Sequence, residues 1–258
     1  GWTPMHAAAQ EDHAEVIGLL AAAGASTEAQ LQGSAFTPLH IAVLHDRAAA
    51  VRALAAAGAA LDAPVDYDHR KHWTPLHLAV RQGHEAVARA VRSAGAAPEA
   101  RDDLDQTPLA LAVSRGGLSM ASALLEEGAR IDAPARDGHT CLYQAVRQGE
   151  EAQVRFLLRH GADPAAAGPD GRSPLQLAAM EGKEALLRLL LETGVPPSQP
   201  DGDGATALHH AARRGHAGVV DYLLSLPRVA IDADDGDGLT ALHMAAEAGQ
   251  AAIVELLL

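Results

Sequence analysis

The sequence is poor in the residues on which several large protein classes depend. It has one cysteine, Cys141, so no intrachain disulfide can form, and we expect an intracellular setting. Aromatic residues make up only 3% of the chain. No apolar run approaches the roughly 20 residues that a membrane-spanning helix needs. Positive charge is also scarce, since 20 Lys and Arg stand against 33 Asp and Glu, for a formal net charge of −13. We therefore expect no membrane insertion and no nucleic-acid partner.

Motifs for catalysis and cofactor binding are missing as well. The chain contains neither a glycine-rich phosphate loop attached to a strand nor a G-x-S-x-G nucleophile motif. The segment DADDGDG (232–238) has Asp237 where a calcium-binding EF-hand loop requires glycine. We therefore predict a protein that is not an enzyme, with no catalytic residue, no cofactor and no metal site.

A recurring tetrapeptide is the most informative feature that is present. It reads TPLH or a close variant, and it starts at Thr3, Thr37, Thr74, Thr107, Thr140, Ser173, Thr206 and Thr240. These starts are spaced by 33 or 34 residues, except for one interval of 37 between Thr37 and Thr74. A fixed period near 33 residues is typical of proteins built from stacked repeats.

Each repeat is predicted to form two short helices. Thr or Ser stands where a helix N-cap is favoured, and Pro often follows at the first helical position. About eight residues later a glycine or aspartate allows a turn, and a second apolar segment follows and usually ends at Gly-Ala. The connection to the next repeat is rich in Asp, Gly and Pro, which favours a tight turn. A single helix pair cannot cover its own apolar face, so the repeats must stack.

The pattern G-x-TPLH-x-A-x-x-x-G-H-x-x-V-x-x-L resembles the ankyrin repeat family over essentially the whole chain. The resemblance implies an all-α fold with short β-hairpin fingers, in which helix-turn-helix units stack as an α-solenoid. By "finger" we mean the polar segment that precedes each core Thr or Ser. We expect residues 1–258 to form one array of eight repeats. Both outer faces of that array would be apolar, so we expect it to be a piece of a longer array.

The resemblance also assigns a structural role to most histidines. It implies that the histidine at the fourth tetrapeptide position forms hydrogen bonds near the core Thr and the neighbouring finger. These histidines are His6, His40, His77, His209 and His243.

Two other groups of side chains leave a chemical alternative open. Asp66, Asp68, His69 and His72 lie in the finger that carries the insertion, and in principle they could bind zinc. We favour an enlarged, solvated finger, because no second pair of ligands is visible. Cys141 follows His139 by two residues at a predicted helix start, where a thiolate can be stabilised. Because no orienting acid accompanies it, we favour a buried structural thiol.

An aromatic column suggests where a partner binds. The residue immediately before the core Thr is Trp2, Phe36 and Trp73 in the first three repeats. The family pattern places this position at the finger base, facing the groove. Exposed aromatic residues along a groove are typical binding hot spots. The alternative is that they only pack the fingers.

A basic strip is predicted beside the aromatic column. At or near the end of the first helix of a repeat stand Arg81, Arg115, Arg147, Arg213 and Arg214, and Arg70, Lys71 and Arg172 lie in the fingers. Part of this pattern can reflect the helix dipole, which favours Arg at a helix C-terminus. The last two fingers are acidic instead. The zoning predicts a protein partner with an extended or helical segment whose acidic residues face the middle repeats.

We therefore expect a non-catalytic module that binds a protein partner through its finger tips and concave groove. One alternative is a structural arm of a large assembly, which would use lateral contacts. Another is a targeting arm of an enzyme or channel domain outside this segment.

Overall fold

The computed structural model describes residues 1–227 and 229–258 and divides the chain into two compact units, Gly1–Arg130 and Ile131–Leu258. Within the described residues the secondary structure is almost entirely helical. Strand pairing is confined to one hairpin in the first unit and an isolated bridge between Asp234 and Thr240 in the second. We describe each unit by itself.

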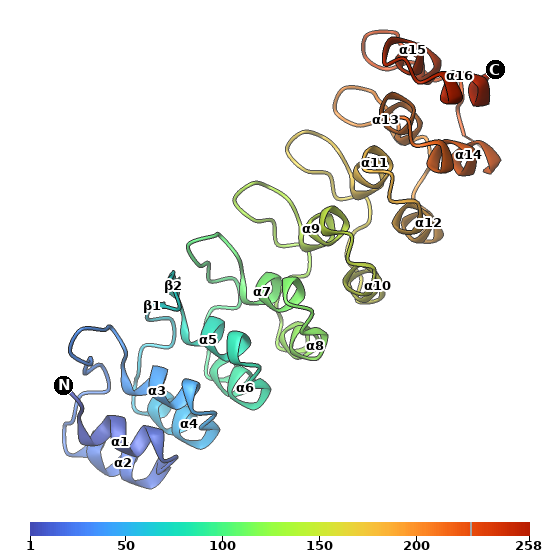
Figure 1. Ribbon diagram of the computed structural model, residues 1–258. Helices are drawn as coiled ribbons and strands as arrows, with labels where there is room; N and C mark the ends of the chain where they lie inside the picture. Colours follow the sequence, from blue (N-terminus) through green and yellow to red (C-terminus); the bar gives the residue numbers. More distant parts are fainter. Residues whose placement is uncertain (228) are drawn as a thin grey trace. The chain divides into compact units, whose positions relative to one another are not determined.

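The first unit contains four helix pairs in its described residues. In chain order these are α1 (Pro4–Gln10) and α2 (Ala14–Ala22), α3 (Pro38–Leu44) and α4 (Ala48–Ala56), α5 (Pro75–Gln82) and α6 (Glu85–Ser93), and α7 (Pro108–Ser114) and α8 (Leu118–Glu126). The first helices of successive pairs pack side by side, and so do the second helices. The fingers project from the row of first helices, as Figure 1 shows.

The second unit repeats this arrangement in its described residues. Its helices are α9 (Cys141–Gln148) and α10 (Glu151–Arg159), α11 (Pro174–Met180) and α12 (Glu184–Glu192), α13 (Ala207–Arg214) and α14 (Ala217–Ser225), and α15 (Ala241–Glu247) and α16 (Ala251–Leu257). Helix α11 packs between α9 and α13, and α13 in turn packs against α15. The second helices contact one another in the same order.

The helices begin where the caps predict. Every first helix starts immediately after the Thr or Ser of the tetrapeptide, whose backbone is extended, as an N-cap requires. Several first helices end at a glycine in the left-handed conformation, such as Gly83 with φ of 78°. Asp12 and Asp46 adopt the same positive φ where the sequence has aspartate instead.

The core of each unit is made of small and branched side chains from both rows of helices. The third tetrapeptide residue is fully buried in most repeats, for example Leu39, Leu76, Leu142 and Leu175 at 0% exposure. Burying one leucine contributes about 1.5–3 kcal/mol relative to leaving it exposed. Many of the other buried side chains are alanines, so the core is built from small residues and few aromatics.

Four of the tetrapeptide histidines each fasten the following finger to their own repeat. In His6, His40 and His77, Nδ1 lies 2.8–2.9 Å from the Thr hydroxyl and accepts a hydrogen bond from the Thr backbone N–H. The proton therefore sits on Nε2, which donates to a carbonyl of the next finger at 2.9–3.3 Å. His209 makes the same contacts, reaching the Leu239 carbonyl at 3.0 Å. Burial lowers the pKa of His40 to about 4, so the ring is neutral.

Gln176 performs the histidine's task in its repeat. Its Oε1 accepts from the backbone N–H of Ser173 at 2.6 Å, and its Nε2 donates to the Gln199 carbonyl at 2.7 Å. The side-chain amide thus offers the same acceptor and donor as neutral imidazole, without a titrating proton.

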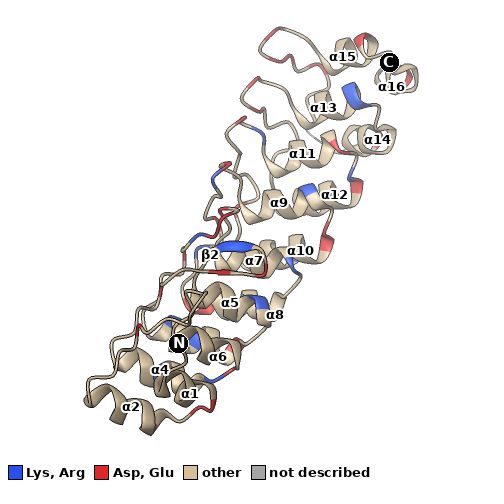
Figure 2. Ribbon diagram, turned by 60° about the vertical axis from the view of Figure 1, so that its left-hand side comes forward, with Lys and Arg blue, Asp and Glu red and all other residues tan. Residues whose placement is uncertain are grey.

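The four-residue insertion forms the hairpin of the first unit. Strand β1 (Val65–Tyr67) pairs antiparallel with β2 (Arg70–Trp73), matching Val65 with Trp73 and Tyr67 with Arg70. The connecting residues Asp68 and His69 both have positive φ, as a two-residue hairpin turn requires. The insertion therefore becomes an enlarged finger, with the basic residues of β2 shown in blue in Figure 2.

Candidate partner-binding site

The structure divides the aromatic column into exposed and buried members. Trp2 is 53% exposed and its ring lies 5.5 Å from that of His6. Phe36 is half-buried and contacts His40 and Tyr67, with ring centroids 5.7 and 6.0 Å away. These two residues lie at the finger base, where a partner can reach them.

Trp73 departs from the prediction of an exposed aromatic residue. It is only 2% exposed, and its Nε1–H donates to Asp102 Oδ2 at 3.2 Å. The enlarged hairpin and the next finger enclose the indole, and a buried indole N–H needs an acceptor. Trp73 therefore packs the fingers, and the prediction that it faces the groove is wrong.

Tyr67 is an aromatic member of this site that the column did not include. Its ring lies 6.0 Å from both Phe36 and Trp73, and its hydroxyl accepts a hydrogen bond from Gln82 at 2.9 Å. The sequence signal was available, because Tyr67 and Trp73 flank the turn of the inserted segment. Only the pairing of β1 with β2 shows that Tyr67 joins Phe36.

Three of the predicted basic residues are already paired within the protein. Arg70 forms ion pairs with Asp102 at 2.7 Å and Asp103 at 3.2 Å. Arg81 pairs with Asp68 at 2.9 Å. In the second unit Arg172 pairs with Asp170 at 3.1 Å and approaches Asp201 at 3.8 Å. These three guanidiniums are half-buried. Because each is paired with a carboxylate, its charge is largely balanced before any partner arrives.

The other predicted basic residues remain exposed. Lys71, Arg115, Arg213 and Arg214 make no ion pair or side-chain hydrogen bond within residues 1–227 and 229–258. Arg147 is exposed, and within these same described residues its side chain donates only to that of Gln144. The basic strip is thus reduced to the ends of the first helices and the tip of one hairpin.

An aspartate shapes the turn of several fingers. Asp102, Asp201 and Asp235 each accept, through Oδ1, hydrogen bonds at 2.9–3.0 Å from the backbone N–H groups two and four residues later. The Asp that stands five residues before the core Thr is therefore a turn-forming device. Asp102 and Asp201 have side chains that are 0% exposed, so their second oxygens also need partners.

Those partners differ between the two units. Asp102 Oδ2 accepts from Arg70 and Trp73. Asp201 Oδ2 instead lies 2.6 Å from His210 Nε2. Burial lowers the pKa of His210, and this effect outweighs the opposing hydrogen bond to Asp201. At neutral pH the His210 ring is therefore a neutral donor to a buried carboxylate.

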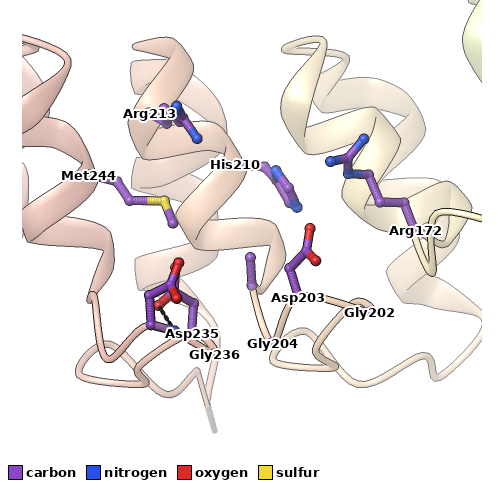
Figure 3. Close-up of a pocket in the computed structure, with 11 residues that line it drawn as sticks. Arg172, Gly202, Asp203, Gly204, His210, Arg213, Asp235, Gly236 and Met244 are labelled. Atoms are coloured by element: carbon purple, nitrogen blue, oxygen red, sulfur yellow. Dashed lines mark hydrogen bonds between the residues drawn. The ribbon is translucent and has the colours of Figure 1, made fainter.

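The second unit contains a cavity of about 440 Å³ between its last fingers and helices α13 and α15. Figure 3 shows the carboxylates of Asp203 and Asp235 rising from the fingers toward the helices, with Arg213 on the far side. The cavity is lined by Arg172, Gly202, Asp203, Gly204, Ala205, His210, Arg213, Asp235, Gly236, Asp237 and Met244. Sequence reasoning identified the acidic fingers but not the cavity, because its second wall comes from two separate repeats.

Neither a metal cluster nor a membrane span is found in the part of the chain that the structure describes. No three His, Cys, Asp or Glu side chains in residues 1–227 and 229–258 are grouped so that they can hold a metal ion. The zinc alternative for Asp66, Asp68, His69 and His72 therefore lacks a ligand set, and Asp68 pairs with Arg81 instead. Cys141 is buried at the start of α9. Among the same residues, no helix is both long and apolar enough to cross a bilayer.

Comparisons with known proteins agree with this architecture. A family model described as ankyrin repeats matches residues 5–102, 91–167, 135–198 and 175–258. Among solved structures, the chain is similar to the ankyrin repeat domain of Bcl-3, described as a unique member of the IkappaB protein family. The two share 30% identity with a TM-score of 0.74, over 87% of this chain and 99% of that one. No curated protein matches. The stacked helix pairs, their Thr-His caps and this family match together show that the chain belongs to the ankyrin repeat family.

Proposed function

We propose that this chain is a non-catalytic module that binds a protein partner along its fingers and the C-terminal ends of its first helices. Ankyrin repeats are in general protein-interaction modules, and this chain follows their pattern throughout. We further propose that it comprises eight repeats, four in each unit. The buried single cysteine supports an intracellular setting.

The observation that carries this proposal is a set of exposed, unpaired cations at equivalent positions. Arg115, Arg213 and Arg214 stand at the ends of first helices without an internal carboxylate partner among the described residues, and Arg147 is bonded only to Gln144. Arg70 and Arg81, by contrast, are each paired with a carboxylate of the protein itself. Unpaired cations that recur at the C-terminal ends of first helices suit a partner segment that presents carboxylates. Trp2 and Phe36 add exposed apolar area at the finger bases of the first unit.

A peptide selection followed by charge reversal tests this proposal. Random linear peptides displayed on phage are selected on the immobilised chain, and the recovered peptides are synthesised and crosslinked to it. We expect crosslinks on fingers and first helices, and acidic residues enriched in the peptides. Replacing Arg115, Arg147 and Arg214 together by Glu is expected to weaken binding by about tenfold or more, because each exposed pair contributes up to about 1 kcal/mol.

The matched control reverses three exposed arginines on second helices. Arg52 lies on α4, and Arg155 and Arg159 lie on α10. Replacing these three by Glu changes the net charge by the same amount and is expected to leave the affinity nearly unchanged. Equal losses for the two triple variants, or crosslinks confined to second helices, would contradict groove binding and favour the structural arm with lateral contacts.

A further inference from the structure

The cavity of the second unit has a chemistry different from the basic helix ends. Its finger side carries three carboxylates, Asp203, Asp235 and Asp237. Asp203 and Asp237 are exposed, and their carboxylates have no hydrogen bond or ion pair within the described residues. The turn of each finger is already made by Asp201 or Asp235, so these two side chains are not used to build the fold.

The positive charges at the cavity do not balance these three carboxylates. Arg172 is committed to Asp170 and Asp201, and only Arg213 remains, on helix α13 away from the fingers (Figure 3). Backbone hydrogen bonds from Leu239 and Asp237 lower the pKa of Asp235, so it stays ionised at neutral pH. An anionic group entering between the fingers would meet three carboxylates, whereas a cation would be attracted by them.

The cavity also provides an apolar surface and room. Met244 of α15 supplies a flexible thioether beside the carboxylates. Gly202, Gly204 and Gly236 line the finger wall without side chains, which leaves backbone accessible. A long basic side chain has the matching composition, because its aliphatic stem can lie along Met244 while its charged head reaches the carboxylates. About 440 Å³ is within the range of pockets that hold small groups.

We propose that this cavity receives a long basic side chain, arginine or lysine, from the bound protein partner. This inference rests on the proposed protein-binding function and adds a specific contact to it. Asp203 and Asp237 hold the cationic head, and Met244 supports its stem. Arg213 bounds the site on the helix side and opposes the incoming charge, so it selects a side chain whose head stays near the fingers.

The experiment uses the whole chain and a small probe. Nα-acetyl-arginine methylamide is titrated into ¹⁵N-labelled protein, and the backbone amides of Gly202, Gly204 and Gly236 are followed by NMR. We expect saturable shifts of these amides, which weaken as salt is added. The acetyl-lysine analogue is expected to bind as well. The acetyl-citrulline analogue, which has nearly the same shape without the charge, is expected to cause no saturable shift.

Variants of opposite sign make the test specific. The double variant Asp203→Asn with Asp237→Asn is expected to lower the affinity for the arginine probe by about fivefold or more, because it removes two exposed ion pairs. Arg213→Ala is expected to raise that affinity. A control, Asp221→Asn with Asp232→Asn, removes two exposed carboxylates that do not line the cavity and is expected to change nothing.

Three results would overturn the inference: citrulline binding as well as arginine, shifts that avoid the three glycine amides, or equal effects of the two double variants. Unchanged thermal unfolding of each variant shows that folding is intact. Selected peptides that still bind the helix ends while the probe fails would leave the proposed function standing and remove only the cavity. Probe binding without any selected peptide would contradict the proposed function alone.

Discussion

Asp102 in the first unit and Asp201 in the second form the same turn and both have a buried carboxylate, yet the second oxygen of each carboxylate has different partners. Asp102 faces Arg70 and Trp73, which can only donate hydrogen bonds. Asp201 faces His210, which is neutral and can change its tautomer, with Arg172 farther away. The comparison shows that the turn geometry is constant, while its electrostatic support is specific to each repeat.

Asparagine substitution gives the largest expected difference between the two aspartates. Asn keeps Oδ1 and hence the turn, but it places an NH₂ group where Oδ2 stood. In Asp102→Asn that group faces two donors and leaves the half-buried Arg70 without its main partner, so we expect a loss of about 3–5 kcal/mol. In Asp201→Asn the imidazole of His210 can turn acceptor, so we expect a loss of about 1 kcal/mol.

Urea unfolding followed by circular dichroism measures both losses, and hydrogen exchange of the finger amides assigns each to its unit. Similar shifts of the unfolding midpoint for Asp102→Asn and Asp201→Asn would show that the nature of the partner at Oδ2 does not matter.

The histidines and the glutamine that fasten the fingers allow a second comparison, of stability at neutral and at acidic pH. His40 has a pKa of about 4 in the folded protein against 6.5 when unfolded. Its stabilising effect is therefore complete above pH 6.5 and is lost as the pH falls toward 4, by about 3 kcal/mol at 1.36 kcal/mol per unit. His40→Gln copies the bonds of Gln176, so we expect stability within about 1 kcal/mol of the parent at pH 7. At pH 4 the variant should be the more stable of the two.

Unfolding midpoints in urea between pH 7 and pH 4 measure this effect. The reciprocal variant Gln176→His is the control, and it should become more sensitive to acid. A parallel pH dependence of parent and His40→Gln would mean that His40 does not contribute to acid unfolding.

The space around a glycine of positive φ differs between a finger of the first unit and one of the second, and so does the stability that alanine is expected to cost there. Gly204 has φ of +83°, and a Cβ there would lie 2.6 Å from the backbone N of Gly236, which donates to the Asp203 carbonyl. Gly33 in the first unit has φ of +80° but open space around it. Gly33→Ala is expected to lose about 1–2 kcal/mol from left-handed strain. Gly204→Ala should lose about 1–3 kcal/mol more, because two fingers must move apart.

Thermal unfolding of the two glycine variants makes the comparison directly. Equal losses for Gly33→Ala and Gly204→Ala would show that the backbone contact between fingers carries no stability.

The sequence predicts the features that repeat, and it does not predict those that depend on one repeat meeting the next. Thr caps, helix starts and the histidine positions recur with the period, so they are read from the pattern with their physical reasons. The burial of Trp73, the pairing of Arg70 and the place of Tyr67 depend on how the inserted hairpin packs on its neighbours. The cavity is likewise formed by residues from three fingers and two helices.

Trp73→Phe gives the smallest expected effect and tests the division of the aromatic column. Phe keeps most of the buried apolar packing but removes the N–H that donates to Asp102, so we expect a loss of about 1 kcal/mol in unfolding free energy. Because Trp73 is 2% exposed, affinity for selected peptides should stay the same. Trp2→Ala is the matched variant at the exposed end of the column, and it should lower affinity without a comparable loss of stability. If Trp73→Phe weakens peptide binding as much as Trp2→Ala does, the column acts as one binding surface after all, and the enclosed indole of the folded chain must open to the partner.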